Sequence, residues 1–410
     1  MGATESIVVV GAGQAGDRAV RTLRAEGFVG NIDLVGEEPH PPYERPPLSK
    51  SVLVGKRDDS VTFLGAGDAY AELGIRWRPG VRVKELDRES RSVLLSSLER
   101  LHYDRLILAT GSRARTLGVP GANHPRIAYL RSLEDCYSLR RNLSASRRVV
   151  IVGGGWIGLE VAASARELGL SVTLLEAGDR LCSRSLPTEV SELIRHWHRQ
   201  RGVDIRLGET VSAVRENKDG RLVVVSGRGE SYPADTMVVG IGAVPNDELA
   251  RDAGLAVDNG ILTDACGRTE DPCVFACGDV SNYYNEFLGR RVRLESWSNA
   301  NNQAVAAARA AMCLPGQNDV VPWFWSEQYG MVVQILGMPE ARCDCFVRGD
   351  IESGSFTRFY IERDTIRTVV AVNRAADVPA SRRLMEHRLA VDPERLVDQS
   401  VPLKKLLKRQ

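Results

Sequence analysis

Two glycine-rich turns with the spacing GxGxxG give this 410-residue chain its clearest chemical signal, which is dinucleotide binding. The first glycine of such a turn allows a tight bend, the second lets a pyrophosphate approach the backbone, and the third lets helix and strand pack closely. The phosphates then face the N-terminus of the helix. The two turns are Gly11-Ala12-Gly13-Gln14-Ala15-Gly16 and Gly153-Gly154-Gly155-Trp156-Ile157-Gly158.

An acidic residue follows each turn at the distance where a ribose is bound, about twenty residues further on. These residues are Glu37 and Glu176. A carboxylate at this position accepts hydrogen bonds from an adenosine ribose and disfavours a 2′-phosphate. One turn alone is weak evidence, but two turns with two acids predict two bound dinucleotides, with a preference for adenosine riboses that carry no 2′-phosphate. Arg180 and Arg184 lie near enough to Glu176 in sequence to blur that preference.

Each glycine turn lies between a strand-like apolar run and a helix-like run. Residues 6–36 and 147–176 both indicate strand, helix and strand, so the binding unit is duplicated. A further apolar run, residues 272–279, ends in Gly-Asp and places a carboxylate at the carboxyl end of a strand, where open α/β sheets bind ligands. These patterns predict an α/β fold with two Rossmann-like dinucleotide-binding domains.

The remaining patterns complete the expected architecture. Residues 103–109 and 235–239 indicate buried strands, and residues 299–312 indicate an alanine-rich helix. Residues 39–50 are too rich in proline for regular structure. From residue 321 the chain changes to aromatic and β-branched runs, which predict an antiparallel sheet in a C-terminal α+β domain. Those runs are residues 323–325, 331–336, 356–361 and 366–372.

Composition excludes several other classes. A formal net charge of +1 argues against a nucleic-acid protein with a broad basic surface. No apolar stretch approaches the roughly twenty residues of a transmembrane helix, and the first strand starts too early to leave room for a signal peptide, so we expect a cytoplasmic protein away from membranes. The eight cysteines are expected to be reduced, with no metal site. His196 and His198 should point apart on a helix as exposed polar residues.

With these features in view, the chain resembles the FAD- and NADH-dependent ferredoxin reductases of bacterial oxygenase systems. The resemblance covers nearly the whole length. It implies a glutathione-reductase-like fold with non-covalent FAD in the first unit and NADH in the second. The expected domains are an FAD-binding domain (1–112 and 243–320), an NADH-binding domain (113–242) and a C-terminal interface domain (321–410). Besides the two glycine turns, the motifs that carry the resemblance are residues 43–50, 109–111, 129–131, 159–160, 277–280, 295–297 and 322–326.

The resemblance also implies roles for individual residues. Lys50, from the proline-rich loop, should lie close to the flavin ring and pair with Glu160, which makes these two the catalytic residues. Gly13 to Ala15 should border the FAD pyrophosphate and Glu37 its ribose. The other expected FAD contacts are Gly11, Gln14, Gly16, Arg45, Val83, Ala109, Thr110, Gly111, Arg131, Asp279 and Trp297. The expected NADH contacts are Gly153, Gly155, Trp156, Ile157, Gly158, Glu160, Glu176, Arg184 and Gly242.

The implied activity is electron transfer from NADH through FAD to a [2Fe–2S] ferredoxin that serves a Rieske dioxygenase or a cytochrome P450. The redox cysteine pair of disulfide-reducing relatives is missing, so the acceptor must be external. Rubredoxin and oxygen are the alternative acceptors, and an interaction protein like apoptosis-inducing factor is the alternative class. The protein is expected to be a monomer or homodimer. Candidate residues for steering an acidic ferredoxin are Arg382, Arg383, Lys404, Lys405, Lys408 and Arg409.

Overall fold

In the computed structural model of the chain, the first glycine turn follows the central strand of a five-stranded parallel sheet. The strand order of this sheet is β19-β7-β1-β2-β3. Strands β1, β7 and β19 are largely buried apolar runs, whereas the edge strand β3 is polar and only partly buried. The structure describes residues 5–65, 67–218, 220–316, 318, 320–339 and 343–407. The five strands are β1 (Ser6–Val10), β2 (Asn31–Val35), β3 (Ile75–Arg78), β7 (Arg105–Leu108) and β19 (Val274–Ala276).

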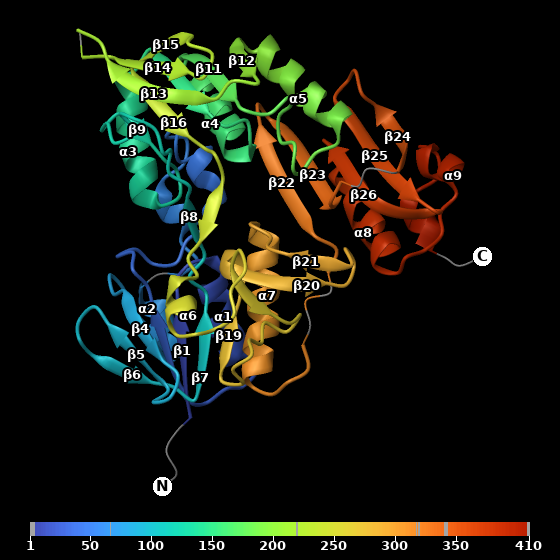
Figure 1. The fold of residues 1–410 in the computed structure, drawn as a ribbon. Helices are drawn as coiled ribbons and strands as arrows, with labels where there is room; N and C mark the ends of the chain where they lie inside the picture. The colour runs from blue at the N-terminus through green and yellow to red at the C-terminus, as the bar shows by residue number, and fades with distance from the viewer. Residues whose placement is uncertain are drawn as a thin grey trace. The chain divides into compact units, whose positions relative to one another are not determined.

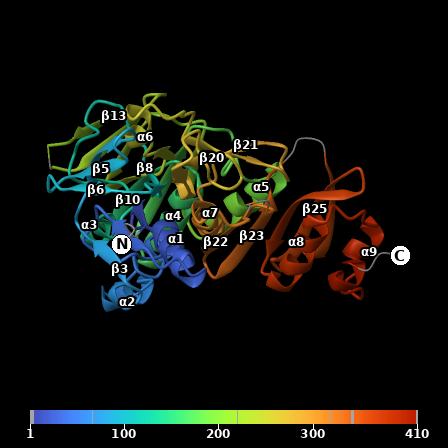
Figure 2. The same ribbon diagram turned by 90° about the horizontal axis from the view of Figure 1, so that it is seen from below.

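Two helices, α1 (Gln14–Ala25) and α7 (Trp297–Ala311), pack side by side in this part of the chain (Figure 2). The small side chains of Ala304, Ala307 and Ala308 are buried there with the core residues of α1 and the sheet. The expected alanine-rich helix is therefore confirmed.

Shorter elements complete the same compact unit, which comprises residues 1–44, 59–113 and 244–323. One three-stranded sheet holds β4 (Val83–Asp87), β5 (Ser92–Leu95) and β6 (Arg100–His102), and another holds β18 (Ile261–Thr263), β20 (Ser281–Asn285) and β21 (Arg290–Val292). The short helices are α2 (Gly67–Glu72), α6 (Glu248–Asp252), η2 (Asp59–Thr62) and η3 (Gly278–Val280).

A second five-stranded parallel sheet, of order β12-β11-β10-β16-β9, surrounds the second glycine turn. It belongs to the other compact unit, residues 45–58, 114–243 and 324–410. The sheet strands are β9 (Ile127–Ala128), β10 (Arg148–Val152), β11 (Ser171–Glu176), β12 (Val203–Leu207) and β16 (Thr236–Val239). Its helices are α3 (Leu133–Ser144), α4 (Trp156–Glu167) and α5 (Thr188–Gln200).

Antiparallel strands β13 (Val211–Glu216), β14 (Leu222–Ser226) and β15 (Ser231–Ala234) form a small sheet in this unit, and β8 (Ser112–Ala114) pairs with β17 (Ala243–Pro245). The proline-rich segment was expected to be irregular, but Pro46–Ser49 form a 3₁₀ turn, η1. The expectation was wrong there because proline at the first helical positions needs no N–H partner and has a suitable φ.

The C-terminal segment forms the predicted antiparallel sheet, of order β22-β23-β26-β25-β24 (Figure 1). Figure 2 shows α8 and α9 beside it. The sequence patterns missed β24, the polar edge strand. The strands are β22 (Trp323–Gln328), β23 (Met331–Gly337), β24 (Asp344–Asp350), β25 (Ser355–Glu362) and β26 (Thr365–Val372), and the helices are η4 (Ala375–Asp377), α8 (Val378–Glu386), α9 (Pro393–Val397) and η5 (Leu403–Leu407).

Candidate functional site

The strands around the first glycine turn end at the same level. Val10 pairs in register with Val35 on one side and with Leu108 on the other, and Leu108 pairs with Ala276. The residues that follow these strands are therefore gathered at one carboxyl edge of the sheet, where open α/β sheets bind ligands. The predicted FAD contacts Gly11, Ala109 and Asp279 all belong to this edge.

The three glycines of the first turn have different surroundings. A Cβ on Gly11 would overlap the carbonyl oxygen of Ala109, and a Cβ on Gly16 would overlap that of Gly11. A Cβ on Gly13 would meet no described atom within 4 Å. Gly13 is also the N-cap of α1, and no described side chain caps that helix end. The turn thus leaves an open face before a helix N-terminus, which suits a pyrophosphate.

Two neighbouring residues of this turn are tied to other elements of the unit. Gln14 Nε2 donates to Asn301 Oδ1 on α7 over 3.1 Å. Ala15 faces Gly278, where an added Cβ would lie only 3.0 Å from the Ala15 methyl group. Asn301 therefore joins the turn to α7, and Gly278 allows the residues after β19 to approach the turn closely.

Two carboxylates flank the edge. Asp279 follows β19, and its Oδ2 accepts a hydrogen bond from Ser112 Oγ over 2.9 Å. Glu37 follows β2; its side chain is 68% exposed and lies 3.5 Å from the Arg82 guanidinium. Both carboxylates stand where acceptors for cofactor hydroxyls are expected.

Asn246 is a residue of this unit that the sequence patterns missed. Its Nδ2 donates to the Thr110 carbonyl oxygen over 2.8 Å, while Thr110 Oγ1 donates to the Asn246 carbonyl oxygen over 2.7 Å. The backbone N–H of Asn246 also donates to the oxygen of Gly111. The small-residue turn after β7 is therefore held by a partner 136 positions away, which no local pattern reveals.

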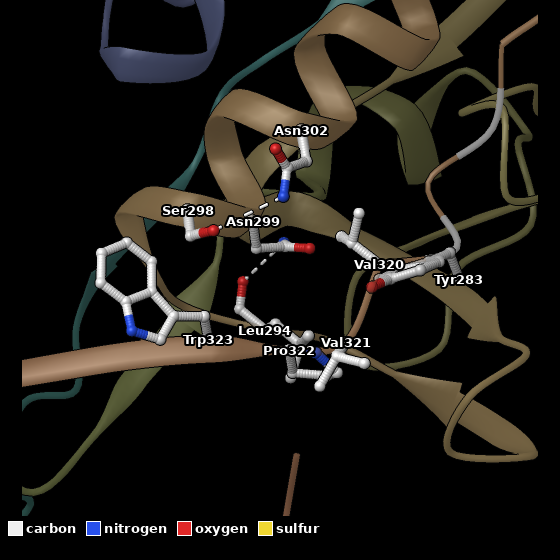
Figure 3. A pocket seen from close by; sticks show the side chains of 9 residues that line it. All are labelled: Tyr283, Leu294, Ser298, Asn299, Asn302, Val320, Val321, Pro322 and Trp323. Atoms are coloured by element: carbon white, nitrogen blue, oxygen red, sulfur yellow. Dashed lines mark hydrogen bonds between the residues drawn. The ribbon is translucent and has the colours of Figure 1, made fainter. Parts of the chain in front are cut away.

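The two other predicted FAD contacts in this unit have structural surroundings of their own. Trp297 begins α7, and its Nε1 donates to Glu44 Oε1 over 3.1 Å. Val83 begins β4 and is buried. A small hollow lies next to the start of α7, but its volume of about 10 Å³ is that of a single water, so it cannot hold a flavin or nicotinamide ring. Figure 3 shows its lining residues: Tyr283, Leu294, Ser298, Asn299, Asn302, Val320, Val321, Pro322 and Trp323.

The second glycine turn repeats the geometry of the first. A Cβ on Gly153 would overlap the oxygen of Gly240, and one on Gly158 would overlap that of Gly153. A Cβ on Gly155 would meet nothing within 4 Å in the described part of the chain. Gly155 is the N-cap of α4. The two turns are built alike, with the same glycine left open.

The Glu176 carboxylate accepts hydrogen bonds from backbone N–H groups at this second turn. Its Oε2 accepts from the Gly154 N–H over 2.5 Å, and its Oε1 accepts from the Gly178 N–H over 2.7 Å. The carboxylate is thereby fixed at the end of β11. Each oxygen keeps a lone pair for a ribose hydroxyl.

Further predicted NADH contacts lie around this turn. The Arg184 guanidinium lies 3.7 Å from where a Cβ of Gly242 would stand. Trp156 Nε1 donates to Ser185 Oγ over 2.9 Å, another partner that the sequence did not indicate. Ile157, the second residue of α4, is 43% exposed although it is large and apolar. An exposed apolar side chain beside the open turn suits a flat ring.

The predicted lysine–glutamate pair forms. Lys50 Nζ lies 2.7 Å from Glu160 Oε2; the lysine side chain is 20% exposed and the glutamate 4%. Two hydroxyls that were not predicted as site groups also donate hydrogen bonds to the Glu160 carboxylate. Ser49 Oγ donates to Oε2 over 2.5 Å, and Ser326 Oγ donates to Oε1 over 2.6 Å. Glu160 is thus a buried carboxylate with a cation and two hydroxyl donors.

The two arginines of this unit that are predicted to contact FAD are joined by a hydrogen bond. Arg45 Nη1 donates to the carbonyl oxygen of Arg131 over 2.5 Å. The N–H of Arg131 in turn donates to Asp135 Oδ2 in the first turn of α3. The proline-rich loop is thereby attached to the start of α3.

The prediction of two exposed histidines was wrong for His198. His196 is exposed, but His198 is fully buried because its face of α5 packs against β22. Burial lowers the pKa of His198 to about 4, so the imidazole is neutral near pH 7.

The cysteines, possible metal ligands and apolar helices bear on the other sequence expectations. All eight cysteines are free thiols, and burial raises the pKa of Cys277 to about 12, so it carries no thiolate near neutral pH. Among the described residues, no His, Cys, Asp or Glu cluster could hold a metal ion. No helix in the described ranges is long and apolar enough to cross a membrane.

Comparisons with known proteins identify the family. The family model described as pyridine nucleotide-disulphide oxidoreductase matches residues 5–304, and a reductase C-terminal model matches residues 323–407. The chain is 40% identical to putidaredoxin reductase of Pseudomonas putida, covering 99% of this chain and 98% of that protein. It is 42% identical to the ferredoxin–NAD(+) reductase component of the anthranilate 1,2-dioxygenase system of Burkholderia cepacia, covering 98% and 99%.

Solved structures give the same result. The reductase in the covalent putidaredoxin reductase–putidaredoxin complex superposes with a TM-score of 0.94 at 40% identity, covering 99% of this chain and 98% of that one. The ferredoxin reductase for the CYP199A2 system of Rhodopseudomonas palustris gives 0.95 at 34% identity, covering 98% and 100%. The predicted glutathione-reductase-like α/β fold is confirmed. The chain therefore belongs to the pyridine nucleotide-disulphide oxidoreductase family, among the flavoprotein ferredoxin–NAD(+) reductases.

Proposed function

We propose that this protein passes electrons from NADH through FAD to a [2Fe–2S] ferredoxin that serves an oxygenase. One observation carries the proposal: two similarly built glycine turns each leave one glycine open before a helix N-terminus that no described side chain caps. Two such turns are typical of a protein that binds two dinucleotides, and membership of the family makes these the electron donor NADH and the flavin FAD. The full-length similarity to ferredoxin–NAD(+) reductases supports ferredoxin as the acceptor.

FAD, when bound, accepts a hydride from NADH and releases the two electrons singly. The residues that would hold it fit its chemistry. The open face at Gly13 admits the pyrophosphate, Glu37 accepts from the adenosine ribose, and Asp279 accepts from hydroxyls of the ribityl chain. The other proposed FAD contacts are Gly11, Gln14, Ala15, Gly16, Arg45, Lys50, Val83, Ala109, Thr110, Gly111, Arg131 and Trp297.

NADH is assigned to the second turn. Gly155 admits its pyrophosphate, the fixed Glu176 carboxylate accepts from its ribose, and the neighbouring Arg184 and Gly242 border the rest of the ligand. A 2′-phosphate would be repelled by Glu176, so NADH is preferred over NADPH. Gly153, Trp156, Ile157, Gly158 and Glu160 complete the proposed NADH contacts.

Lys50 is assigned the charge that favours reduced flavin. A cation near the flavin stabilises the negative charge that the ring gains on reduction. Glu160 keeps the ammonium in place, and its own charge is compensated by the lysine and two hydroxyls. No general acid or nucleophile is required of the protein.

The acceptor is external because the free cysteines offer no redox pair beside the flavin. We further propose the three-domain division 1–112 with 243–320, 113–242 and 321–410, a cytoplasmic location, and a monomer or homodimer without nucleic-acid partners.

A two-step anaerobic experiment tests the proposal. The purified yellow protein is reduced with one equivalent of NADH and then mixed with an oxidised [2Fe–2S] ferredoxin of an oxygenase system. We expect flavin reduction, and then reoxidation that reduces two ferredoxins per NADH, because each takes one electron. The flavin should be FAD and should leave the protein on acid denaturation. Reduced flavin that persists in the presence of ferredoxin would overturn the proposal.

A further inference from the structure

A line of hydrogen bonds leads from Glu160 along β22 to α5, elements that lie beside one another in Figure 1. Ser326 Oγ donates to Glu160 Oε1 over 2.6 Å, and Gln328 Nε2 donates to Ser326 Oγ over 3.0 Å. Gln328 Oε1 lies 2.7 Å from His198 Nε2 on α5, and His198 Nδ1 lies 3.1 Å from the Tyr329 hydroxyl. Ser326 and Gln328 are two positions apart on the strand, so they share one face.

The bonding capacity of each group, together with a neutral His198, gives the direction of every bond in this line. A carboxylate only accepts, so Ser326 gives its one proton to Glu160 and accepts from the Gln328 amide. The amide oxygen then faces His198, which must donate from Nε2 and accept at Nδ1. That arrangement is a neutral imidazole, and all donors in the line point toward Glu160.

The surroundings keep this arrangement in one protonation state. Burial lowers the pKa of His198 to about 4, with Arg201 acting in the same direction and the bond to Gln328 opposing it. Burial also raises the pKa of the Tyr329 phenol to about 12. Among the described residues, the ionisable groups that interact with Glu160 include Lys50 and the Cys182 thiol, whose pKa burial raises far above neutrality.

We propose that Ser326, Gln328 and His198 are positioning residues for the Lys50–Glu160 pair. They orient Glu160 Oε1, which leaves Oε2 to face Lys50 Nζ. The C-terminal segment thereby takes part in the NADH half of the reaction through β22. This inference rests on the proposed role of the pair.

The pH dependence of flavin reduction tests the inference. The observed rate with NADH is measured anaerobically by stopped flow from pH 5 to 9, without ferredoxin, for Ser326→Ala. Loss of a hydrogen bond to a charged group should move the acidic limb of the profile to higher pH by about one unit. Ser326→Thr retains the hydroxyl and should restore the wild-type limb.

Two further variants sharpen the test. Gln328→Glu offers Ser326 a second carboxylate acceptor, so it should move the limb further than Ser326→Ala does. Ser146→Ala is the matched control: it removes another buried hydroxyl bond of the same unit, to Thr236, close to the start of β10 and away from Glu160. It should leave the limb in place.

The outcomes separate this inference from the proposed function. If Lys50→Met and Glu160→Gln leave flavin reduction at the wild-type rate, the role of the pair is wrong. If those two variants slow reduction but Ser326→Ala and Gln328→Glu keep the wild-type limb, or lower the rate equally at every pH, the positioning role is overturned.

Discussion

Glu176 shows how one side chain can select a cofactor and shape its binding turn. Both of its oxygens are held by backbone N–H groups of Gly154 and Gly178. We expect Glu176→Ala to lower kcat/KM for NADH, because an acceptor for the ribose hydroxyls is lost. The preference for NADH over NADPH should narrow by roughly tenfold, because the carboxylate that repels the 2′-phosphate is removed. Steady-state kinetics with both nicotinamides measures this.

Glu37→Ala is the control for that prediction, since Glu37 occupies the same position after the other glycine turn. It should weaken FAD retention while the nicotinamide preference stays the same. Equal kcat/KM for NADH and NADPH in the unmodified protein would show that the assignment of Glu176 is wrong.

His198 makes a second prediction, on stability. Its pKa is about 4 in the folded protein and about 6.5 when unfolded, so the unfolded chain binds more protons between these values. The contribution of His198 to the free energy of unfolding should therefore be fully present above pH 6.5. It should decrease as the pH falls toward 4, by on the order of 3 kcal/mol.

Denaturant unfolding at several pH values measures that loss. His198→Gln removes the titrating ring, so its stability should change less over the same pH interval. An equally steep decrease in the variant would assign the acid sensitivity to other groups.

At the scale of elements, two glycines of the same turn have different roles, one in stability and the other in NADH binding. Gly158→Ala should destabilise the protein by about 2 kcal/mol or more, because its methyl group would overlap the oxygen of Gly153. Gly155→Ala should fold normally, since a Cβ there meets nothing in the described part of the chain and the backbone is extended. Its KM for NADH should nevertheless rise, because the methyl group occupies the space assigned to the pyrophosphate.

Thermal melting and NADH kinetics on the two variants measure these effects. If Gly155→Ala binds NADH like the wild type, the open face beside that residue does not hold the pyrophosphate.

Periodicity and glycine spacing predicted both parallel sheets and the C-terminal antiparallel sheet, because apolar runs of strand length are local signals. They missed β24, whose polar residues do not alternate like those of a buried strand. They also missed Arg348 of that strand, which is buried and donates to the carbonyl oxygens of Leu396 and Val401. Such contacts join residues about fifty positions apart and leave no local pattern.

The sequence likewise predicted only part of the candidate site. Lys50 and Glu160 were paired through the resemblance to a family, and the structure places them 2.7 Å apart. The hydroxyl of Ser326 was not foreseen, because its partner lies 166 positions away. Burial of His198 was not foreseen either, since the packing of α5 against β22 cannot be read from the helix alone.

At the scale of the whole molecule, the ferredoxin surface is a prediction about charge. Arg383 on α8 and Lys404 and Lys405 on η5 are exposed, and these two elements pack together. Arg382 is half-buried, while Lys408 and Arg409 lie outside the described residues. Because exposed charges are screened over roughly 8 Å at physiological ionic strength, added salt should slow ferredoxin reduction but not NADH-to-ferricyanide turnover.

Charge reversal by Lys404→Glu and Lys405→Glu should also slow ferredoxin reduction, by roughly tenfold at low salt, and leave ferricyanide turnover unchanged. If both salt and charge reversal are without effect, docking must rely on apolar groups, with Trp323 and Trp325 of β22 as the candidates.

Acceptor specificity tests the central claim most directly. NADH oxidation is followed with a [2Fe–2S] ferredoxin of an oxygenase system, with rubredoxin and with oxygen, under the same conditions and with the same preparation of the FAD-loaded protein. The proposed function predicts that kcat/KM for the ferredoxin exceeds that for either other acceptor by at least about tenfold. Turnover that is fastest with oxygen or rubredoxin, with the ferredoxin left oxidised, would contradict it.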